Sequence, residues 1–568
     1  MKVFSLIENE INDYLTKDFE ISEGYRFSQY KLVKRISLFA NGIYKKGKVD
    51  KQKNYKLWID ISSPRIDSEV KNIDFDTKDI LLYSDSKKDT GAMMLCNLEL
   101  RKWLRKTGKA EEINDDVEQG SGWGNVVWKK IKGGYETVDL KNFYVINQTA
   151  KTLNDTPAIE RHILTQSYLR TKKGVWKNID EVIKSCGNKG FSATPQGTTE
   201  NKETPYYEIY ERNGEVSEAA LFEAQGKAGG DENKYVLAKI ICAGLKMGSS
   251  EGKYVLFAKE IPAMPYKEYH RGRWNGRWFR VGIYELLFDI QYRANEISNQ
   301  IAIGLKWASK TIFTSSDNLL RRNILKDLNS GAIIKTTNLT QLNVRMEGMD
   351  QLIADWNRLM TTADRLCNSY EIVTGEGMPA GTSFKLGALT NQNATKLFDF
   401  LREKLSLALQ SVFEDWVVDD LVASLKREEV IRLTGDEDGV RQFYETLING
   451  WYINNLLRMP PHTTEQALEI KKMKLKEILA SPAKYIKAEN EWLEGVKPRV
   501  IVIISGENIN LIQDLETLSS FIALEADPIR RTALIEKAMR IKGINVDDLP
   551  KTEQTQQQVP MKAEAVAK

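Results

Sequence analysis

Residues 283–308 form the most informative stretch of the chain, IYELLFDIQYRANEISNQIAIGLKWA. Its apolar side chains recur at steps of three and four, the spacing that gathers side chains on one face of an α-helix. That face consists of Ile283, Leu287, Ile290, Ala294, Ile297, Ile301, Leu305 and Ala308. At about 1.5 Å per residue the helix is roughly 40 Å long. Because such a helix buries its apolar face against another long element, we predict that it packs lengthwise against a second helix.

The second helix is predicted at residues 349–372, where the same spacing recurs. Its apolar face consists of Leu352, Trp356, Leu359, Ala363, Leu366 and Tyr370. Between the two helices, residues 310–348 combine short β-type runs with turn residues, which predicts a compact βαββ unit. The predicted elements of this unit are a strand at 310–314, a helix at 318–328, and strands at 332–335 and 341–347.

A third long helix is predicted from about residue 391 to about Glu429. It follows residues 375–387, GEGMPAGTSFKLG, a segment too rich in glycine to be helical. The apolar face of this helix consists of Ala394, Phe398, Leu401, Leu405, Ala408, Val412 and Trp416. Three long helices therefore dominate the middle of the chain.

The regions before and after these helices alternate strand and helix patterns, which indicates an α+β fold. In the N-terminal half we predict strands at 55–61 and 143–146, helices at 93–105 and 178–185, a loop at 190–205, and an antiparallel meander at 206–211, 235–242 and 254–258. The apolar, β-branched run Arg499–Ser505 is predicted to complete a sheet begun in the N-terminal half. Helices are expected at 511–525 and 528–542, before a disordered tail.

Composition sets limits on function. A chain of 568 residues is longer than one hydrophobic core usually organises, so we expect several structural regions. The charges of the 82 basic and 78 acidic side chains nearly cancel, which argues against a protein that binds nucleic acid over its whole surface. The four cysteines are far apart in sequence, so we expect reduced thiols in a cytosolic setting. The first ten residues reach a charge too early for the apolar core of a signal peptide, and no uncharged apolar run approaches about 20 residues, so we expect a soluble chain without a membrane span.

Motifs for catalysis, metals and cofactors are mostly missing. The three histidines lie far apart with no zinc-binding spacing, and the glycines at 375–381 lack the Lys-Ser/Thr of a phosphate-binding loop. Gly120-Ser-Gly-Trp-Gly124 lacks dinucleotide-binding spacing and is predicted to be a turn. We therefore expect neither an enzyme nor a bound cofactor.

Two clusters of charged residues have alternative interpretations. One interpretation of Asp415, Asp419 and Asp420 is a metal-binding group of carboxylates. We favour the interpretation that these aspartates lie on the solvated side of the third helix, because the neighbouring apolar residues form its packed side: Trp416, Val417, Val418 and Leu421. Residues 270–280, HRGRWNGRWFR, interleave Arg271, Arg273, Arg277 and Arg280 with three aromatic side chains. That composition is typical of a nucleic-acid contact. We slightly favour a second interpretation, in which the arginines pair with acidic neighbours and anchor the following helix.

The order of these elements resembles the portal proteins of tailed double-stranded DNA phages. The resemblance rests on Pro265–Arg280 leading directly into residues 284–299, YELLFDIQYRANEISN, with Asp289, Gln291, Asn295 and Asn299. Residues 118–129, 138–145 and 159–170 are similar to the wing of larger podovirus-type portals. The similarity lies in the layout of the chain from about residue 90 to 545 more than in any invariant motif.

The resemblance implies a portal-type subunit with successive named regions. These are an N-terminal wing part at 1–281, a first stem helix at 282–309, a clip at 310–348, a second stem helix at 349–372, a tunnel loop at 373–390, a long helix and C-terminal wing part at 391–505, a helical crown at 506–548, and a disordered tail at 549–568. Within them it implies Lys385 and Glu376 as residues near the DNA channel, and Arg321, Arg322 and Lys326 of the clip as partner-facing charges.

The function implied by the resemblance is structural. Twelve copies would form a ring at one capsid vertex of the virion, assembled in the host cytoplasm, through which the genome is packaged and ejected. The implied partners are other copies of the chain, double-stranded DNA, the terminase large subunit, the major capsid protein and head-completion or tail adaptor proteins. Two alternatives remain open: a metal-dependent nucleic-acid enzyme that uses the aspartates and arginines above, and a structural virion protein that forms no ring.

Overall fold

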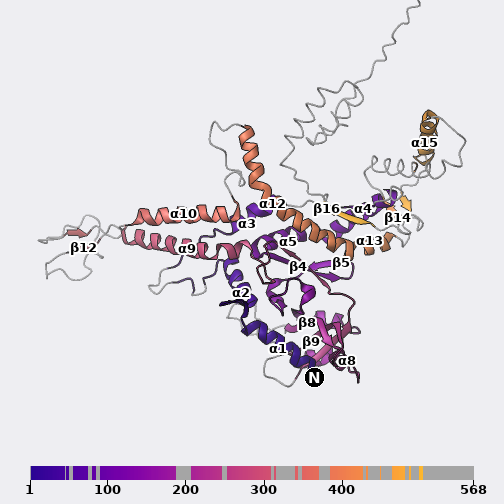
Figure 1. Cartoon of the computed structure of the whole chain (residues 1–568), viewed down its shortest axis with the longest axis horizontal. Helices are drawn as coiled ribbons and strands as arrows, with labels where there is room; N and C mark the ends of the chain where they lie inside the picture. Colours follow the sequence, from indigo (N-terminus) through magenta and orange to yellow (C-terminus); the bar gives the residue numbers. More distant parts are fainter. Residues whose placement is uncertain are drawn as a thin grey trace, which may run out of the picture. The chain divides into compact units, whose positions relative to one another are not determined.

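The computed structural model describes residues 2–44, 47–49, 55–73, 80–84, 90–186, 206–245, 252–308, 312–314, 340–342, 348–369, 384–425, 430–432, 448, 464–479, 485–487 and 498–502. The chain divides into two compact units, Met1–Ile503 and Ile504–Lys568. All described residues lie in the first unit, so the helices predicted at 511–525 and 528–542 and the tail lie outside them. The described part combines helices and antiparallel sheets, which confirms the α+β class (Figure 1).

Two long helices pack against each other as the periodicity predicts. Helix α9 spans Ile283–Ala308 and helix α10 spans Met349–Cys367, and the two run side by side (Figure 1). The indole Nε1 of Trp356 on α10 donates to the Ser298 hydroxyl on α9 over 3.0 Å. Helix α10 ends earlier than predicted, because Asn368 adopts a left-handed conformation with φ of 53°.

The segment between these helices contains a described pair of strands. Strand β12, Ile312–Thr314, pairs antiparallel with β13, Thr340–Leu342, so that Ile312 lies opposite Leu342. Both strands overlap predicted strands. The helix predicted at 318–328, with Arg321, Arg322 and Lys326, and the strand predicted at 332–335 lie outside the described residues.

The third long helix begins earlier than predicted. Helix α12 spans Phe384–Val412, so the prediction that residues 384–387 are non-helical was wrong. The loop expected at 373–390 is likewise helical from residue 384 onward, and Lys385 lies in the first turn of a helix. Only one glycine falls within this turn, and its cost of about 1 kcal/mol is small beside the propensity of the Leu and Ala residues that follow. A π-helical turn at Phe413–Val417 then leads into α13, Val418–Leu425.

The predicted meander belongs to a larger five-stranded antiparallel sheet. Its strand order is β10-β9-β8-β7-β6. The strands span Tyr254–Glu260, Tyr235–Ala243, Tyr206–Ser217, Ala158–Thr165 and Phe143–Val145 in that order. Alternate residues face opposite ways: Ile240 packs toward helices α1 (Lys2–Thr16) and α8 (Glu218–Gln225), while Ile241 packs toward α6 (Gln166–Thr171) and α7 (Ile179–Ser185). Helices therefore cover both faces of the sheet.

A second sheet lies beside helix α12. It has the order β11-β4-β5, with strands Tyr266–His270, Asn125–Ile131 and Gly134–Thr137. Its core is shared with α4 (Thr90–Thr107), α5 (Lys109–Trp123) and the apolar face of α12. Helix α4 confirms the helix predicted at 93–105, whereas no helix was predicted where α5 lies.

The strand predicted at residues 499–505 pairs with the N-terminal half as expected, although no strand was predicted at residues 80–83. Strand β16, Arg499–Val502, pairs antiparallel with β3, Ile80–Tyr83, and Val500 at its centre is fully buried. The other described elements are β1 (Phe19–Ser22), β2 (Tyr25–Phe27), α2 (Gln29–Ala40), α3 (Ser63–Ile73), β14 (Val430–Arg432), α15 (Thr464–Leu479) and β15 (Tyr485–Lys487). Among the described helices, none is long and apolar enough to span a membrane.

The strand predicted at 55–61 was wrong, because only Tyr55 forms a β-bridge, with Val49. Residues 57–61, here called the strap, instead bond to side-chain amides of α9. The backbone N–H groups of Leu57, Ile59 and Ile61 donate to the side-chain oxygens of Asn299, Asn295 and Gln291 over 2.6, 2.8 and 2.9 Å. The spacings match, because four helical residues rise about 6 Å and two extended residues about 6.6 Å.

Candidate functional site

The arginine-rich loop before α9 is held mainly by ion pairs. Arg271 makes a two-bond pair with Glu69 of α3 at 2.6 and 2.7 Å. Arg277 does the same with Glu285, in the first turn of α9, at 2.7 Å for both bonds, and its guanidinium lies over the ring of Phe27. Two of the four arginines therefore pair with acidic neighbours, as the anchoring interpretation predicts.

The other two arginines have different surroundings. Arg280 is buried and donates to the carbonyl oxygens of Arg277 and Lys151. Burial lowers the pKa of its guanidinium to about 10, with Glu268 opposing the shift and Arg277 adding to it. Arg273 is exposed beside Trp274, at the tip of the loop.

Helix α12 adds another cation to this loop. The ammonium of Lys404 donates to the carbonyl oxygens of Arg271 and Gly272 over 3.1 and 3.5 Å. Burial lowers the pKa of Lys404, and the positive charges of Arg280 and Arg271 lower it further. Among the described residues, no carboxylate lies within ion-pair distance of Arg273, Arg280 or Lys404. Positive charge is therefore in excess around the loop.

Two glycines allow the chain to cross itself where α5 ends and α9 begins. Gly124, with φ of 90°, ends α5, and a Cβ there would lie 2.6 Å from the carbonyl oxygen of Arg280 and from the nitrogen of Gly282. A Cβ at Gly282 would meet the Gly122 carbonyl oxygen at 2.4 Å. The prediction that Gly120–Gly124 is a turn was wrong for residues 120–123, which are helical, because only Gly124 leaves the helix.

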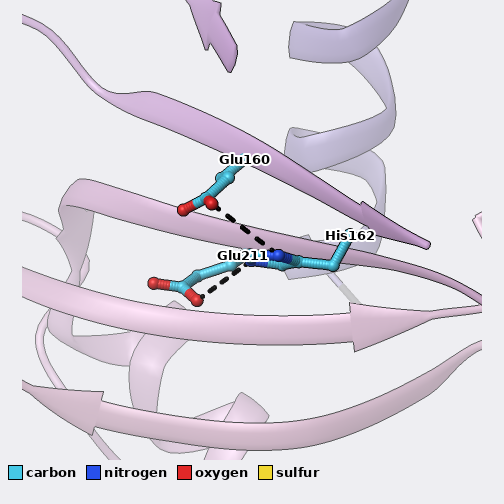
Figure 2. A group of neighbouring side chains, drawn as sticks. All are labelled: Glu160, His162 and Glu211. Atoms are coloured by element: carbon cyan, nitrogen blue, oxygen red, sulfur yellow. Dashed lines mark ion pairs between the residues drawn. The ribbon is translucent and has the colours of Figure 1, made fainter. Parts of the chain in front are cut away.

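Within the described part of the chain, one group of side chains has the composition of a metal site. Glu160 and His162 lie two residues apart on β7, so they share a face, and Glu211 on β8 lies directly across from Glu160 (Figure 2). His162 Nε2 is 3.3 Å from Glu211 Oε2, and His162 Nδ1 is 3.7 Å from Glu160 Oε1. The sequence prediction missed this group, although the alternating Glu-Arg-His of a strand was a usable signal.

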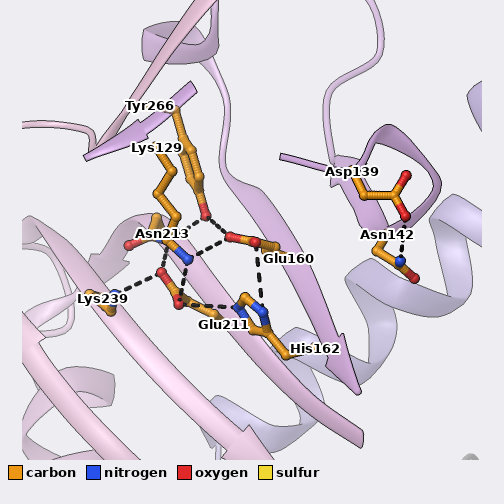
Figure 3. A network of polar contacts seen from close by, with 9 residues as sticks. All are labelled: Lys129, Asp139, Asn142, Glu160, His162, Glu211, Asn213, Lys239 and Tyr266. Carbon is orange, nitrogen blue, oxygen red and sulfur yellow. Dashed lines mark hydrogen bonds and ion pairs between the residues drawn. The ribbon is translucent and has the colours of Figure 1, made fainter. Parts of the chain in front are cut away.

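Two lysines already neutralise these carboxylates (Figure 3). The ammonium of Lys129, on β4, lies 2.6 Å from Glu160 and 2.9 Å from Glu211, and that of Lys239, on β9, lies 2.8 Å from Glu211. Burial alone raises the pKa of Glu211, but His162, Lys129 and Lys239 together hold that pKa well below its ordinary value. A divalent ion would add two positive charges to a balanced, buried site, so the electrostatics favour a structural network over a metal centre.

The network joins the two sheets. Tyr266, on β11, brings its hydroxyl within 3.2 Å of Glu160, and the Asn213 amide on β8 donates to Glu211 and to the Tyr266 oxygen over 3.0 and 2.9 Å. Lys129 and Tyr266 belong to the three-stranded sheet, whereas the carboxylates belong to the five-stranded sheet. Buried polar contacts therefore set how these two sheets dock.

The aspartates considered as metal ligands lie on the solvated side of the helix. Asp419 and Asp420 are exposed, and Asp415 pairs with Lys267. Trp416, Val417, Val418 and Leu421 are buried, as predicted. Among the described side chains, the three aspartates do not form a group that could hold a metal ion.

A buried carboxyl group lies under the three-stranded sheet. Asp116 of α5 accepts from the Trp128 indole and from the Thr137 hydroxyl, each over 2.7 Å. Burial raises its pKa to about 7; those two hydrogen bonds oppose the shift and Glu112 adds to it. The folded state therefore binds a proton that the unfolded state releases near pH 4, and stability falls as pH rises from about 4 to about 7.

Replacing this carboxyl group should remove that pH dependence. We expect Asp116→Asn to leave the free energy of unfolding nearly unchanged at pH 4 and to raise it by about 4 kcal/mol at pH 8, since an amide cannot ionise and about three pKa units correspond to that energy. Denaturant unfolding at both pH values measures the difference, with Asp115→Asn as the exposed control. Equal effects of Asp116→Asn at pH 4 and pH 8 would contradict the raised pKa.

The residues predicted at the channel and the clip are largely outside the described part. Glu376 and Arg321, Arg322 and Lys326 lie outside it, and for Lys385 the structure gives only its place in the first turn of α12. The structure brings Arg277 and Arg280 together before α9, and Lys404 lies near both Arg271 and Arg280.

Comparisons with known proteins add no assignment. The sequence matches no protein-family model and has no significant match among curated proteins. Function is therefore inferred from the residues and their geometry.

Proposed function

We propose that this chain is a portal subunit of a tailed double-stranded DNA phage. In this proposal, copies form a ring at one capsid vertex, the genome passes through its channel during packaging and ejection, and the ring docks first the terminase and then the tail. The observation that carries the proposal is the pair of long helices α9 and α10, which enclose a segment with paired strands and precede a third long helix. That order matches the family layout described above.

Exposed apolar side chains on these helices support assembly. Six of them are between 45% and 59% exposed: Tyr292, Leu305, Ile353, Leu366, Phe400 and Leu407. Scattered exposed apolar residues are ordinary, but several on three consecutive long helices are typical of surfaces that neighbouring subunits cover. In a ring each subunit presents one face to the next and a different face to the previous one, so separate helices can both be covered.

The attachment of both helices to the α/β body also supports a ring. Arg277 pairs with Glu285 at the start of α9, and Arg65 of α3 pairs with Asp364 of α10 at 2.6 Å. These ion pairs connect both helices to the body. A closed ring needs a constant angle between neighbouring subunits, and such connections restrict how far the helices can move relative to the body.

The alternatives are less well supported by the site. A metal-dependent nucleic-acid enzyme would need grouped carboxylates, yet Asp415 is engaged by Lys267 and Asp419 and Asp420 face solvent. A structural virion protein without a ring would share the helices and their exposed apolar residues. Assembly state separates this last alternative from a portal.

Ring formation is the direct test. Negative-stain electron microscopy of the purified chain should show end-on rings with a stain-filled hole, and light scattering should give a mass about twelve times the 64.9 kDa of one chain. We expect Leu305→Glu and Leu407→Glu to disrupt the rings, because each places a charge in a covered apolar contact. Val175→Glu, a change at a 66% exposed site away from the long helices, is the control. Uniform monomers of the unmodified chain at all concentrations and salts would refute the proposal.

A further inference from the structure

The loop at residues 271–276 has an exposed tip between two bonded ends. Its ends are fixed by the buried, bonded side chains of Arg271 and Arg277. Gly276 turns the chain with φ of 76°, and a Cβ at Gly272 would lie 3.1 Å from the Val281 backbone. Between these points Arg273 is exposed and Trp274 is 52% exposed. An exposed indole beside an exposed arginine offers a partner both a flat aromatic surface and a positive charge.

Helix α12 extends this surface. Lys404 bonds to the loop carbonyls, and Phe400, one turn earlier on α12, is 54% exposed. The Lys404 ammonium lies 5.7 Å from the centre of the Phe400 ring. We call the four residues Arg273, Trp274, Phe400 and Lys404 the cationic-aromatic patch.

The charge balance of the patch points to an anionic partner. Arg280 lies behind the loop, and neither it nor Arg273 or Lys404 has a carboxylate partner among the described residues. The lowered pKa of Lys404, which burial and the nearby arginines cause, indicates that a negative charge here would be favourable. Arg271 and Arg277, by contrast, are fully paired with glutamates.

We propose that the cationic-aromatic patch binds the phosphodiester backbone of nucleic acid. The cations would contact phosphates, and the two aromatic side chains would contact sugars or bases. Nucleic acid fits better than an acidic protein, because it offers flat ring surfaces beside each charge, whereas a carboxylate side chain offers charge alone. The affinity of the patch for nucleic acid does not depend on the proposed function. Only the identification of that nucleic acid as the phage genome rests on the proposed function.

The test is fluorescence anisotropy of the full-length chain with 5′-labelled 30-nucleotide DNA, single-stranded and duplex, over a series of salt concentrations. We expect Arg273→Glu/Trp274→Ala to weaken binding about tenfold or more and to flatten the salt dependence, since a phosphate contact and a stacking contact are both lost. A larger loss of affinity for single-stranded DNA than for duplex would indicate that Trp274 contacts bases. An equal loss of affinity for both DNAs would indicate that the patch contacts phosphates.

A matched control uses the same kinds of residue elsewhere. Tyr168, which is 45% exposed, and Arg170 on α6 also place an exposed aromatic beside an exposed arginine. Tyr168→Ala/Arg170→Glu makes the same change in charge and should alter affinity less than about threefold. Equal losses for the two double variants, or no loss for either, would overturn the proposal.

The oligomeric mass of the same samples separates this inference from the proposed function. If Arg273→Glu/Trp274→Ala abolishes assembly while DNA affinity per chain is unchanged, the patch is a contact between copies and the inference fails. If the unmodified chain forms no rings but binds DNA through the patch, the portal proposal fails and this inference stands.

Discussion

Lys129→Met is expected to lower the free energy of unfolding by about 3–5 kcal/mol, the usual cost of removing one partner from a buried ion pair. The change leaves Glu160 and Glu211 buried, with Lys239 paired to Glu211 and no lysine paired to Glu160. Because Lys129 also links the two sheets, we expect their docking to weaken as well. Denaturant unfolding followed by tryptophan fluorescence measures the change.

Two further variants isolate the charge. Lys129→Met/Glu160→Gln restores balance, because Glu211 keeps Lys239 as its partner, and it should recover at least half of the lost stability. Lys130→Met alters the adjacent, exposed lysine of β4 and should change stability by less than about 1 kcal/mol. If Lys129→Met and Lys130→Met unfold at the same denaturant concentration, the network does not hold the sheets together.

Gly124→Ala is expected to destabilise the chain by about 3–5 kcal/mol. Two costs add: a left-handed conformation for a residue with a side chain, and a Cβ forced against the Arg280 and Gly282 backbone at 2.6 Å. Backbone atoms cannot move aside as a flexible side chain would. The midpoint of thermal or denaturant unfolding reports the loss.

Gly133→Ala separates the two costs. Gly133 has φ of 86°, close to the 90° of Gly124, but no atom lies within 4 Å of where its Cβ would be. This control carries the conformational cost alone and should destabilise by about 1–2 kcal/mol. Losses of the same size at both positions would show that the close crossing of α5 and α9 contributes little.

The long helices were predictable because their signal is local and repeated. The apolar faces of α9 and α10 extend over many turns, so single errors in spacing do not change the prediction. Strand β16 was also predictable, since a β-branched run as apolar as Arg499–Val502 needs a buried position beside another strand.

The features that sequence patterns missed depend on contacts between distant residues. Leu57, Ile59 and Ile61 have the composition of a strand, but their backbone partners are side-chain amides more than 200 residues away. The Glu160, His162 and Glu211 group depends on the register of β7 against β8, which one sequence does not reveal. The arginines at 271 and 277 were open to two interpretations until Glu69 and Glu285 were placed beside them.

The strap on α9 is recognised through its backbone alone. Gln291, Asn295 and Asn299 bond to peptide groups at every second residue, so any residue except proline at positions 57 and 59 keeps those bonds. Relative to its fixed ends, adding or removing one residue would turn the N–H groups of residues 57, 59 and 61 away from α9. Among homologous chains, evolution is therefore free to change the side chains at positions 57 and 59, whereas the length of the strap and the four-residue spacing of the three amides must change together or not at all.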